Sequence, residues 1–146
     1  MSLSTALYSY LTAQAGFTSV FSTRLWYMVA SSSVTTLPYC TYEIISGDHV
    51  HHLTGAAGLV QRRVLFTVVA ATPISCEAGY EALRAELDGY PNDTMGSGSL
   101  AIGGISLESE DFSHVYSKLG TDVAQGIFMA EMTFMIWHEE SVPTYA

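Results

Sequence analysis

Apolar residues recur at helical spacing in two parts of the chain. The first stripe consists of Leu3, Ala6, Leu7, Tyr10 and Leu11. It predicts a helix over 2–14, which Gly16 is expected to end. The second stripe consists of Tyr80, Leu83 and Leu87. It predicts a helix over 76–88, with Ser75 as its N-cap.

Five other segments have the branched and aromatic content, or the alternation, of strands. They are 24–29, 39–46, 61–71, 99–108 and 126–138. Segment 61–71 is apolar on both faces, which predicts a central strand buried on both sides. Segment 47–58 is interpreted as a strand end running into an exposed loop or a long hairpin tip. The polar segment 108–125 is expected to be a mobile or interacting loop.

The order of elements is helix, three strands, helix, two strands, with neither an internal repeat nor a long linker. This order predicts one domain over residues 1–146 in the α+β class. We expect a mostly antiparallel sheet of about five strands, with two helices packed on one face.

Composition adds a hypothesis about assembly. Hydrophobic residues make up 49% of the chain, but charged residues only 13%, about half the usual share, and the formal net charge is −9. The aromatic content disfavours disorder, and the scarcity of basic residues disfavours a dedicated nucleic-acid binder. A sheet with apolar residues on both faces and only two helices has one face left to cover. Subunit contacts are the simplest way to cover it, so we expect a homo-oligomer.

The sequence predicts neither secretion nor a membrane partner. The first residues lack the basic region of a signal peptide, and apolar runs such as 64–71 are too short to cross a bilayer. Cys40 and Cys76 are expected to be buried thiols, although Cys76 lies near a helix start, where its pKa would fall.

The sharpest candidate for chemistry is the run from Asp48 to His52. In an extended segment His49 and His51 point to one side, where both could reach a metal ion. A zinc enzyme needs three protein ligands, so Glu43 or Asp48 would have to join them. Polar residues on a loop or strand edge are the simpler interpretation. The patterns of serine nucleophiles and phosphate-binding loops are missing, so no cofactor is expected.

The order of several motifs resembles the tail-completion, or tail-terminator, proteins of long-tailed phages and gene transfer agents. The matching segments are 3–11, Thr36-Leu37-Pro38-Tyr39, His51-His52-Leu53-Thr54-Gly55 with Gly58-Leu59, strand 63–71, helix end 83–90 and closing strand 133–139. None of them is a catalytic signature, and together they cover nearly the whole chain.

The resemblance implies a structural role without catalysis, in a virion assembled in the host cytoplasm. Subunits of that family form a hexameric ring at the head-proximal end of the tail tube. The ring stops tube polymerisation and offers a surface to the connector, or head-completion protein. Tube protein, connector and further copies of the chain are thus the implied partners, and DNA only passes through the lumen.

On this analogy two polar segments are candidate partner contacts. Their candidate residues are His49, His51, His52, Leu53, Thr54, Gly55, Gly58, Leu59, Glu110, Asp111, His114 and Lys118. Three other functions stay open. The chain is alternatively a neighbouring head-completion or tail-tube ring protein, a small histidine-based metal enzyme, or an oligomer that binds a small molecule between sheet and helices.

Overall fold

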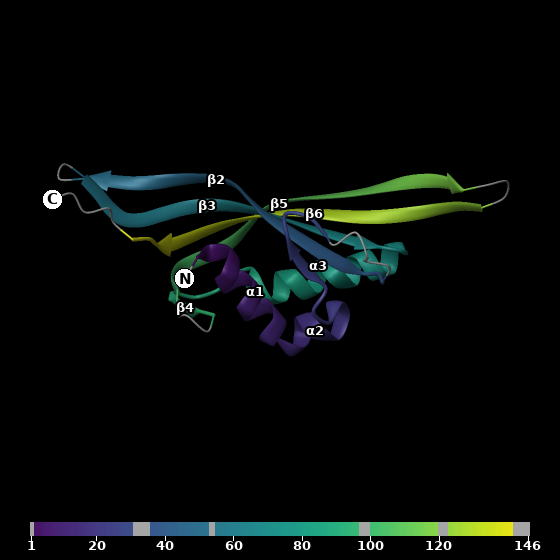
Figure 1. The fold of residues 1–146 in the computed structure, drawn as a ribbon, viewed down its shortest axis with the longest axis horizontal. Helices are drawn as coiled ribbons and strands as arrows, with labels where there is room; N and C mark the ends of the chain where they lie inside the picture. Colours follow the sequence, from purple (N-terminus) through teal and green to yellow (C-terminus); the bar gives the residue numbers. More distant parts are fainter. Residues whose placement is uncertain (1, 31–35, 53–54, 97–99, 120–122, 142–146) are drawn as a thin grey trace.

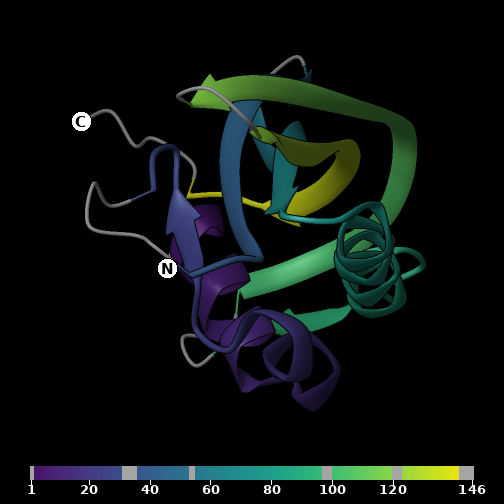
Figure 2. The same cartoon turned by 90° about the vertical axis from the view of Figure 1, so that its right-hand side faces the viewer.

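The computed structural model describes residues 2–30, 36–52, 55–96, 100–119 and 123–141. At 52, 55–57, 115–119 and 123–126 it describes the backbone alone. The predicted α+β class is confirmed, with three helices on one face of a six-stranded sheet. Figure 1 shows the helices beneath the middle of a long sheet, and Figure 2 shows end-on how strongly the sheet twists.

Two of the helices lie at the N-terminus, where the sequence predicted one. Helix α1 (Leu3–Ala13) begins at Ser2, whose side chain accepts a hydrogen bond from the Thr5 N–H. Helix α2 (Ala15–Phe21) contains Gly16, so the prediction that this glycine ends the helical segment was wrong. The chain bends at extended Gln14 and starts again, because burial of Phe17 and Phe21 at i, i+4 spacing stabilises a second short helix.

Helix α3 (Pro73–Leu87) begins three residues earlier than predicted. Thr72, not Ser75, is the N-cap, and its side chain accepts a hydrogen bond from the Ser75 N–H. Proline suits the first turn because it has no N–H to leave unpaired there. The element that the sequence placed at 76–88 is therefore confirmed, with a corrected start.

The sheet has the strand order β1-β2-β3-β6-β5-β4. Its strands are β1 (Leu25–Tyr27), β2 (Tyr39–His52), β3 (Gly55–Ala70), β4 (Asp93–Met95), β5 (Leu100–Leu119) and β6 (Val123–Glu139). Only the β1–β2 pair is parallel. Strand β4 lies outside the five segments predicted as strands, and it pairs with three residues of β5.

The two predicted loops are mostly strand. Segment 47–58 continues β2 and β3 as a long hairpin, as one of its two interpretations allowed, and segment 108–125 continues β5 into β6. Because the side chains of these two segments are polar, the sequence indicated loops instead of strands. Cross-strand pairing satisfies the backbone N–H and C=O groups whatever side chains project from it, so polar residues continue a hairpin into solvent.

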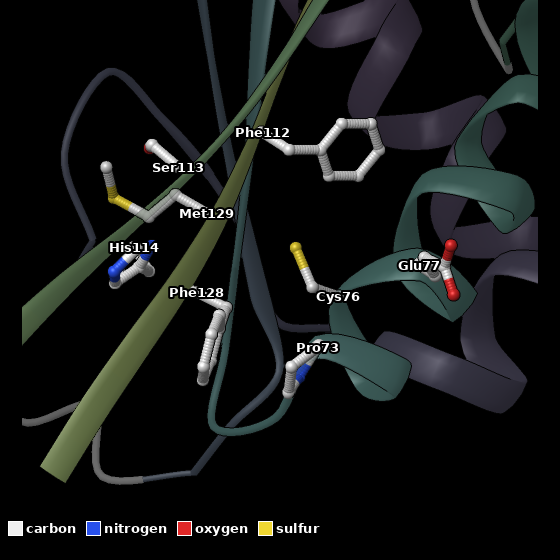
Figure 3. Close-up of a pocket in the computed structure, with 8 residues that line it drawn as sticks. All are labelled: Pro73, Cys76, Glu77, Phe112, Ser113, His114, Phe128 and Met129. Carbon is white, nitrogen blue, oxygen red and sulfur yellow. The ribbon is translucent and has the colours of Figure 1, made fainter.

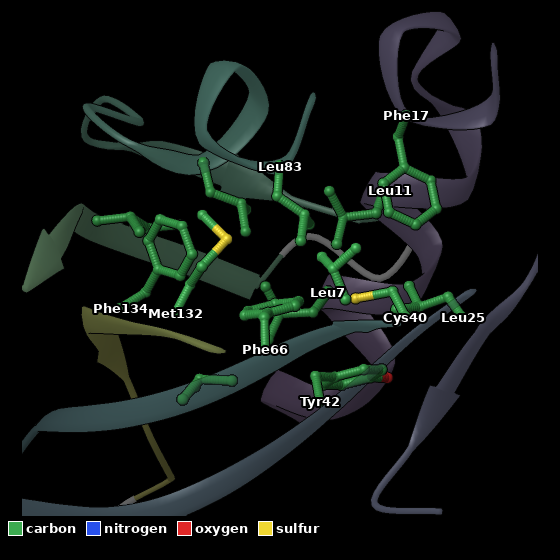
Figure 4. Packing of buried hydrophobic residues seen from close by; sticks show 14 of the residues in the cluster. Leu7, Leu11, Phe17, Leu25, Cys40, Tyr42, Phe66, Leu83, Met132 and Phe134 are labelled. Atoms are coloured by element: carbon green, nitrogen blue, oxygen red, sulfur yellow. The ribbon is translucent and has the colours of Figure 1, made fainter. Parts of the chain in front are cut away.

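The core lies between the helices and one face of the sheet (Figure 4). Phe66 of β3 stacks on Tyr42 of β2 and meets Phe134 of β6 edge-on. Leu7 and Leu83 cover this layer from the helices (Figure 4). As predicted, Cys40 and Cys76 are buried free thiols.

Strand β3 is not buried on both sides, as the sequence predicted. Its core-facing residues Val64, Phe66 and Val68 are fully buried, whereas Leu65 and Thr67 on the other side are only partly covered. We call this second side the open face of the sheet. The helices occupy one layer only, so in the single chain the open face has no layer above it (Figure 1).

Two hairpins extend beyond the helices to opposite ends of the molecule (Figure 1). The β2–β3 arm comprises 46–63, which follows a register irregularity between Ile44 and Ser46. The β5–β6 arm comprises 115–119 and 123–127, beyond the last β3–β6 pair, Ala70 with Phe128. Among the described helices, none is long and apolar enough to span a membrane.

Candidate assembly interface

The first group of candidate residues lies on the β2–β3 arm. His49 pairs across the hairpin with Val60, His51 with Ala56 and His52 with Gly55. Gly58 has a φ of 79°, and its carbonyl accepts a hydrogen bond from the Glu140 N–H. Leu59 is exposed. Leu53 and Thr54 lie outside the described residues.

The second group follows β5 toward the β5–β6 arm. Glu110 pairs with Met132, Asp111 with Glu131, and His114 with Phe128 at the root of the arm. Lys118 lies within the arm, where its backbone pairs with Ala124. The first group lies on the β2–β3 arm, whereas the second runs from the middle of the sheet to the β5–β6 arm at the opposite end of the molecule, so one chain does not bring them together (Figure 1).

The histidines whose side chains are described do not come together as metal ligands. His49 Nδ1 lies 2.6 Å from Glu140 Oε1, and a register irregularity separates His49 from His51. Among the described residues, no group of three or more His, Cys, Asp or Glu side chains is placed to hold a metal ion. The geometry of the described residues thus gives the hypothesis of a histidine-based metal enzyme no support.

Sequence reasoning missed His138 in this region. It pairs with Val60 and Ile102 and is 4% exposed. Its Nδ1 donates to the Glu139 carbonyl oxygen at 2.7 Å, while its Nε2 is buried without a hydrogen-bond partner. Burial lowers the pKa of this imidazole, so it stays neutral under ordinary conditions. Alternation along β6 places position 138 on the core face, and that was the signal available in the sequence.

The open face carries mostly acidic charge. Arg63 donates to Glu108, with Nε 2.9 Å from Oε2, and its Nη1 lies 3.9 Å from Asp48 Oδ2. These contacts link β2, β3 and β5 across the open face. Cross-strand register places three further carboxylates on the same side, those of Glu43, Asp111 and Glu131. On the described part of this face, carboxylates therefore outnumber the guanidinium of Arg63.

A mostly apolar cavity lies between the start of α3 and the root of the β5–β6 arm (Figure 3). Its volume is about 320 Å³, and its lining includes Cys76, Phe112 and Phe128. Burial and the nearby Glu77 carboxylate raise the pKa of Cys76, contrary to the lowering expected near a helix start. The thiol is therefore protonated and poorly suited to nucleophilic attack.

Large apolar side chains are exposed around this cavity. Ile74 on α3 is 79% exposed, and Phe112 and Ile127 on the adjoining strands are also exposed. The ring of Phe112 packs edge-on against Tyr80, with centroids 5.2 Å apart. An exposed apolar cluster of this kind is typical of a surface that contacts another protein.

Comparison with known proteins identifies a similar fold. No family model and no curated protein matches the chain. A chain in the solved virion of a native gene transfer agent particle superposes with a TM-score of 0.62 at 16% sequence identity. The match covers 94% of this chain and 99% of that one. The two chains therefore share a fold over nearly their whole length.

Proposed function

We propose that this chain is a structural component of a phage-like virion and has no catalytic role. The observation that carries the proposal is the fold shared, over nearly the whole of both chains, with a chain of a gene transfer agent virion. The match extends over 94% of this chain and 99% of that one, so the likeness does not depend on one common motif. The two arms and the exposed apolar cluster are features of a subunit that is completed by neighbours.

More specifically, we propose a tail terminator. Copies of the chain, six on the family analogy, form a ring at the head-proximal end of the tail tube. One side of the ring docks on the last tube ring, and the other side binds the head-completion, or connector, protein. Because the two sides differ, no further tube ring adds. The order of the sequence motifs supports this assignment over that of a neighbouring ring protein.

The charge of the open face fits a channel for DNA. If the open faces line the lumen, the carboxylates of Glu43, Asp111 and Glu131 face the passing phosphates. Like charges repel, so DNA slides through the ring without adhering to its wall. The scarcity of basic residues in the whole chain points the same way.

Removing this chain from particles tests the terminator role. Tails made without it should be abnormally long and variable, and they should lack heads, because nothing stops tube growth or forms the joining surface. Electron microscopy of negatively stained particles measures both properties. Supplying the unaltered chain should restore uniform length. Headless tails of normal, uniform length would contradict tube termination.

Purified protein separates the terminator from the tube-protein alternative. A terminator should be seen as monomers or discrete rings, because it lacks a surface that repeats along the tube axis. A tube protein polymerises with itself, so spontaneous long tubes would favour that alternative.

A further inference from the structure

Strand β2 has an unpaired edge. Strand β1 pairs only with Cys40–Tyr42, and the last hydrogen bond to this edge runs from the Met28 N–H to the Tyr42 carbonyl. From Ile44 to His52, nine residues of β2 have β3 on one side and, among the described residues, no strand on the other. Residues 45–49 are all exposed, and Ile45 is 49% exposed.

This edge lacks most of the usual protection against strand addition. Proteins commonly block long edges with proline, lysine or a covering helix, because open N–H and C=O groups bind other strands. Segment 44–52 contains neither proline, lysine nor arginine. Two irregularities interrupt it, between Ile44 and Ser46 and between His49 and His51, and the stretch from Ser46 to His49 between them pairs continuously with β3. The edge is therefore suited to accept a strand from another chain.

The outer edge of β5 is covered near the helices, but in the arm it has no neighbouring strand among the described residues. Strand β4 covers Leu100–Ile102, and the end of α3 covers the next stretch, where Gly89 N–H donates to the Ile105 carbonyl. The Leu107 N–H donates to the Asp88 carboxylate at 3.0 Å. At 115–119 the strand has passed beyond the helices, within an arm that two strands form by themselves (Figure 1). A lone two-stranded hairpin is marginally stable in water, so the arm gains from a third strand.

We infer that the β5–β6 arm of one copy adds its outer strand, at 115–119, to the β2 edge of the next copy. This inference rests on the proposed ring and names the contact that builds it. The lengths are compatible, since five residues of β5 span about 17 Å and nine residues of β2 about 30 Å. Lys118 belongs to the donated strand, and exposed Asp48 lies on the receiving edge.

Topology favours this pairing over a symmetric dimer. The two edges lie on opposite sides of the sheet, and the arms point to opposite ends of the molecule (Figure 1), so one chain cannot satisfy both. A dimer that pairs two β2 edges would leave both β5–β6 arms unsupported. Pairing unlike edges repeats from copy to copy, and such a head-to-tail contact closes into a ring when its rotation allows.

Disulfide trapping tests the inference in the purified full-length chain. Ser46→Cys places a thiol on the receiving edge, and Ser117→Cys places one on the donated strand. The native cysteines are buried and should not interfere. A mixture of the two variants under mild oxidation should give at least ten times more covalent dimer than either variant alone. The double variant should give a ladder that ends in one closed species.

Two further cysteine variants support the crosslinking experiment, one as a negative control and one as a second reporter. Ser19→Cys, on the exposed side of α2 and away from both edges, should not crosslink to Ser117→Cys. Asp48→Cys provides a second reporter on the receiving edge in case Ser46→Cys does not fold. Crosslinking of Ser46→Cys to itself as readily as to its partner would overturn the inference in favour of a symmetric dimer. Absence of the mixed crosslink with both edge reporters would also overturn it.

This result is independent of the test of the terminator role. Mixed crosslinks in a protein whose removal leaves tail length normal would keep the strand exchange and reject termination. Abnormal tails without mixed crosslinks would keep termination and reject the strand exchange.

Discussion

His138 combines burial with an unsatisfied ring nitrogen. Its Nε2 is enclosed without a partner, so a proton added there would place a charge in the interior without a hydrogen-bond acceptor. Burial is the main cause of its lowered pKa. The charges of Arg62 and His49 lower the pKa further, and Glu140 together with the Glu139 carbonyl opposes them. Position 138 therefore couples the stability of the sheet to pH.

The lowered pKa of His138 determines whether the free energy of unfolding rises or falls with pH. The native imidazole binds a proton less readily than the imidazole of the unfolded chain, whose pKa is near 6.5. On acidification the unfolded state therefore takes up more protons. The free energy of unfolding should reach its full value above pH 6.5 and decrease as the pH falls below it. Urea unfolding of the unaltered chain at pH 7.5, 6.0 and 5.0 measures this decrease.

Substitution of His138 should weaken the dependence of the free energy of unfolding on pH. His138→Leu removes the titrating ring, so its free energy of unfolding should fall less between pH 7.5 and 5.0. His51→Gln is the matched control, because it removes an exposed histidine from the neighbouring arm and should leave the decrease unchanged. Equal slopes for the unaltered chain and His138→Leu would contradict the argument.

At the scale of elements, close contact at Gly79 sets how α3 sits on the core. A Cβ atom at this position would lie 2.7 Å from Phe21 Cζ on α2 and 2.7 Å from Val68 Cγ1 on β3. Both neighbours are fully buried and have little room to move. The missing side chain therefore lets α3 approach both α2 and the sheet, which also fixes the start of α3 beside the root of the β5–β6 arm.

Gly79→Ala should destabilise the protein despite the higher helix propensity of alanine. Propensity favours the substitution by about 1 kcal/mol, whereas overpacking of a rigid core costs about 1–3 kcal/mol. We expect a net loss of up to about 2 kcal/mol in the free energy of unfolding, measured by chemical denaturation. Gly16→Ala is the control, because its Cβ would meet only the end of the flexible Glu86 side chain. A Gly79→Ala protein as stable as the control would show that the helix can shift.

At the scale of the whole molecule, net charge opposes assembly. Each copy carries a formal charge of −9, and a ring brings several such copies together. Repulsion between them is screened by salt, with a Debye length of about 30 Å at 0.01 M and about 10 Å at 0.1 M. Apolar contacts and strand pairing, the expected attractive forces, depend much less on ionic strength.

Raising the salt concentration should therefore promote ring formation. Analytical ultracentrifugation at fixed protein concentration should record a larger fraction of rings at 0.3 M than at 0.01 M sodium chloride. Glu131→Gln removes one carboxylate per copy from the open face and should reduce the salt dependence. Rings that dissociate as salt is added would instead indicate attraction between opposite charges at the interface.

Amphipathic spacing predicted much of the secondary structure of this protein from the sequence alone. The stripe beginning at Leu3 and the stripe that includes Leu83 predicted α1 and α3, and alternation located the middle of each long strand. Side-chain pattern reports which face is buried, so it is informative wherever one side contacts the core. Composition led to the hypothesis of a chain that assembles, and motif order to a resemblance to tail terminators; both stay predictions, because the match to a virion chain shows a shared fold alone.

Only the tertiary structure decided how far the strands extend and what lies at their edges. Polar segments such as 108–119 read as loops, because the hydrogen bonds that make them strands join backbone groups distant in sequence. The edge at Ile44–His52 is open because β1 is short, and the sequence of β2 does not record the length of its neighbour. The burial of His138 and the separation of the two arms have the same origin, since both depend on which strands lie side by side.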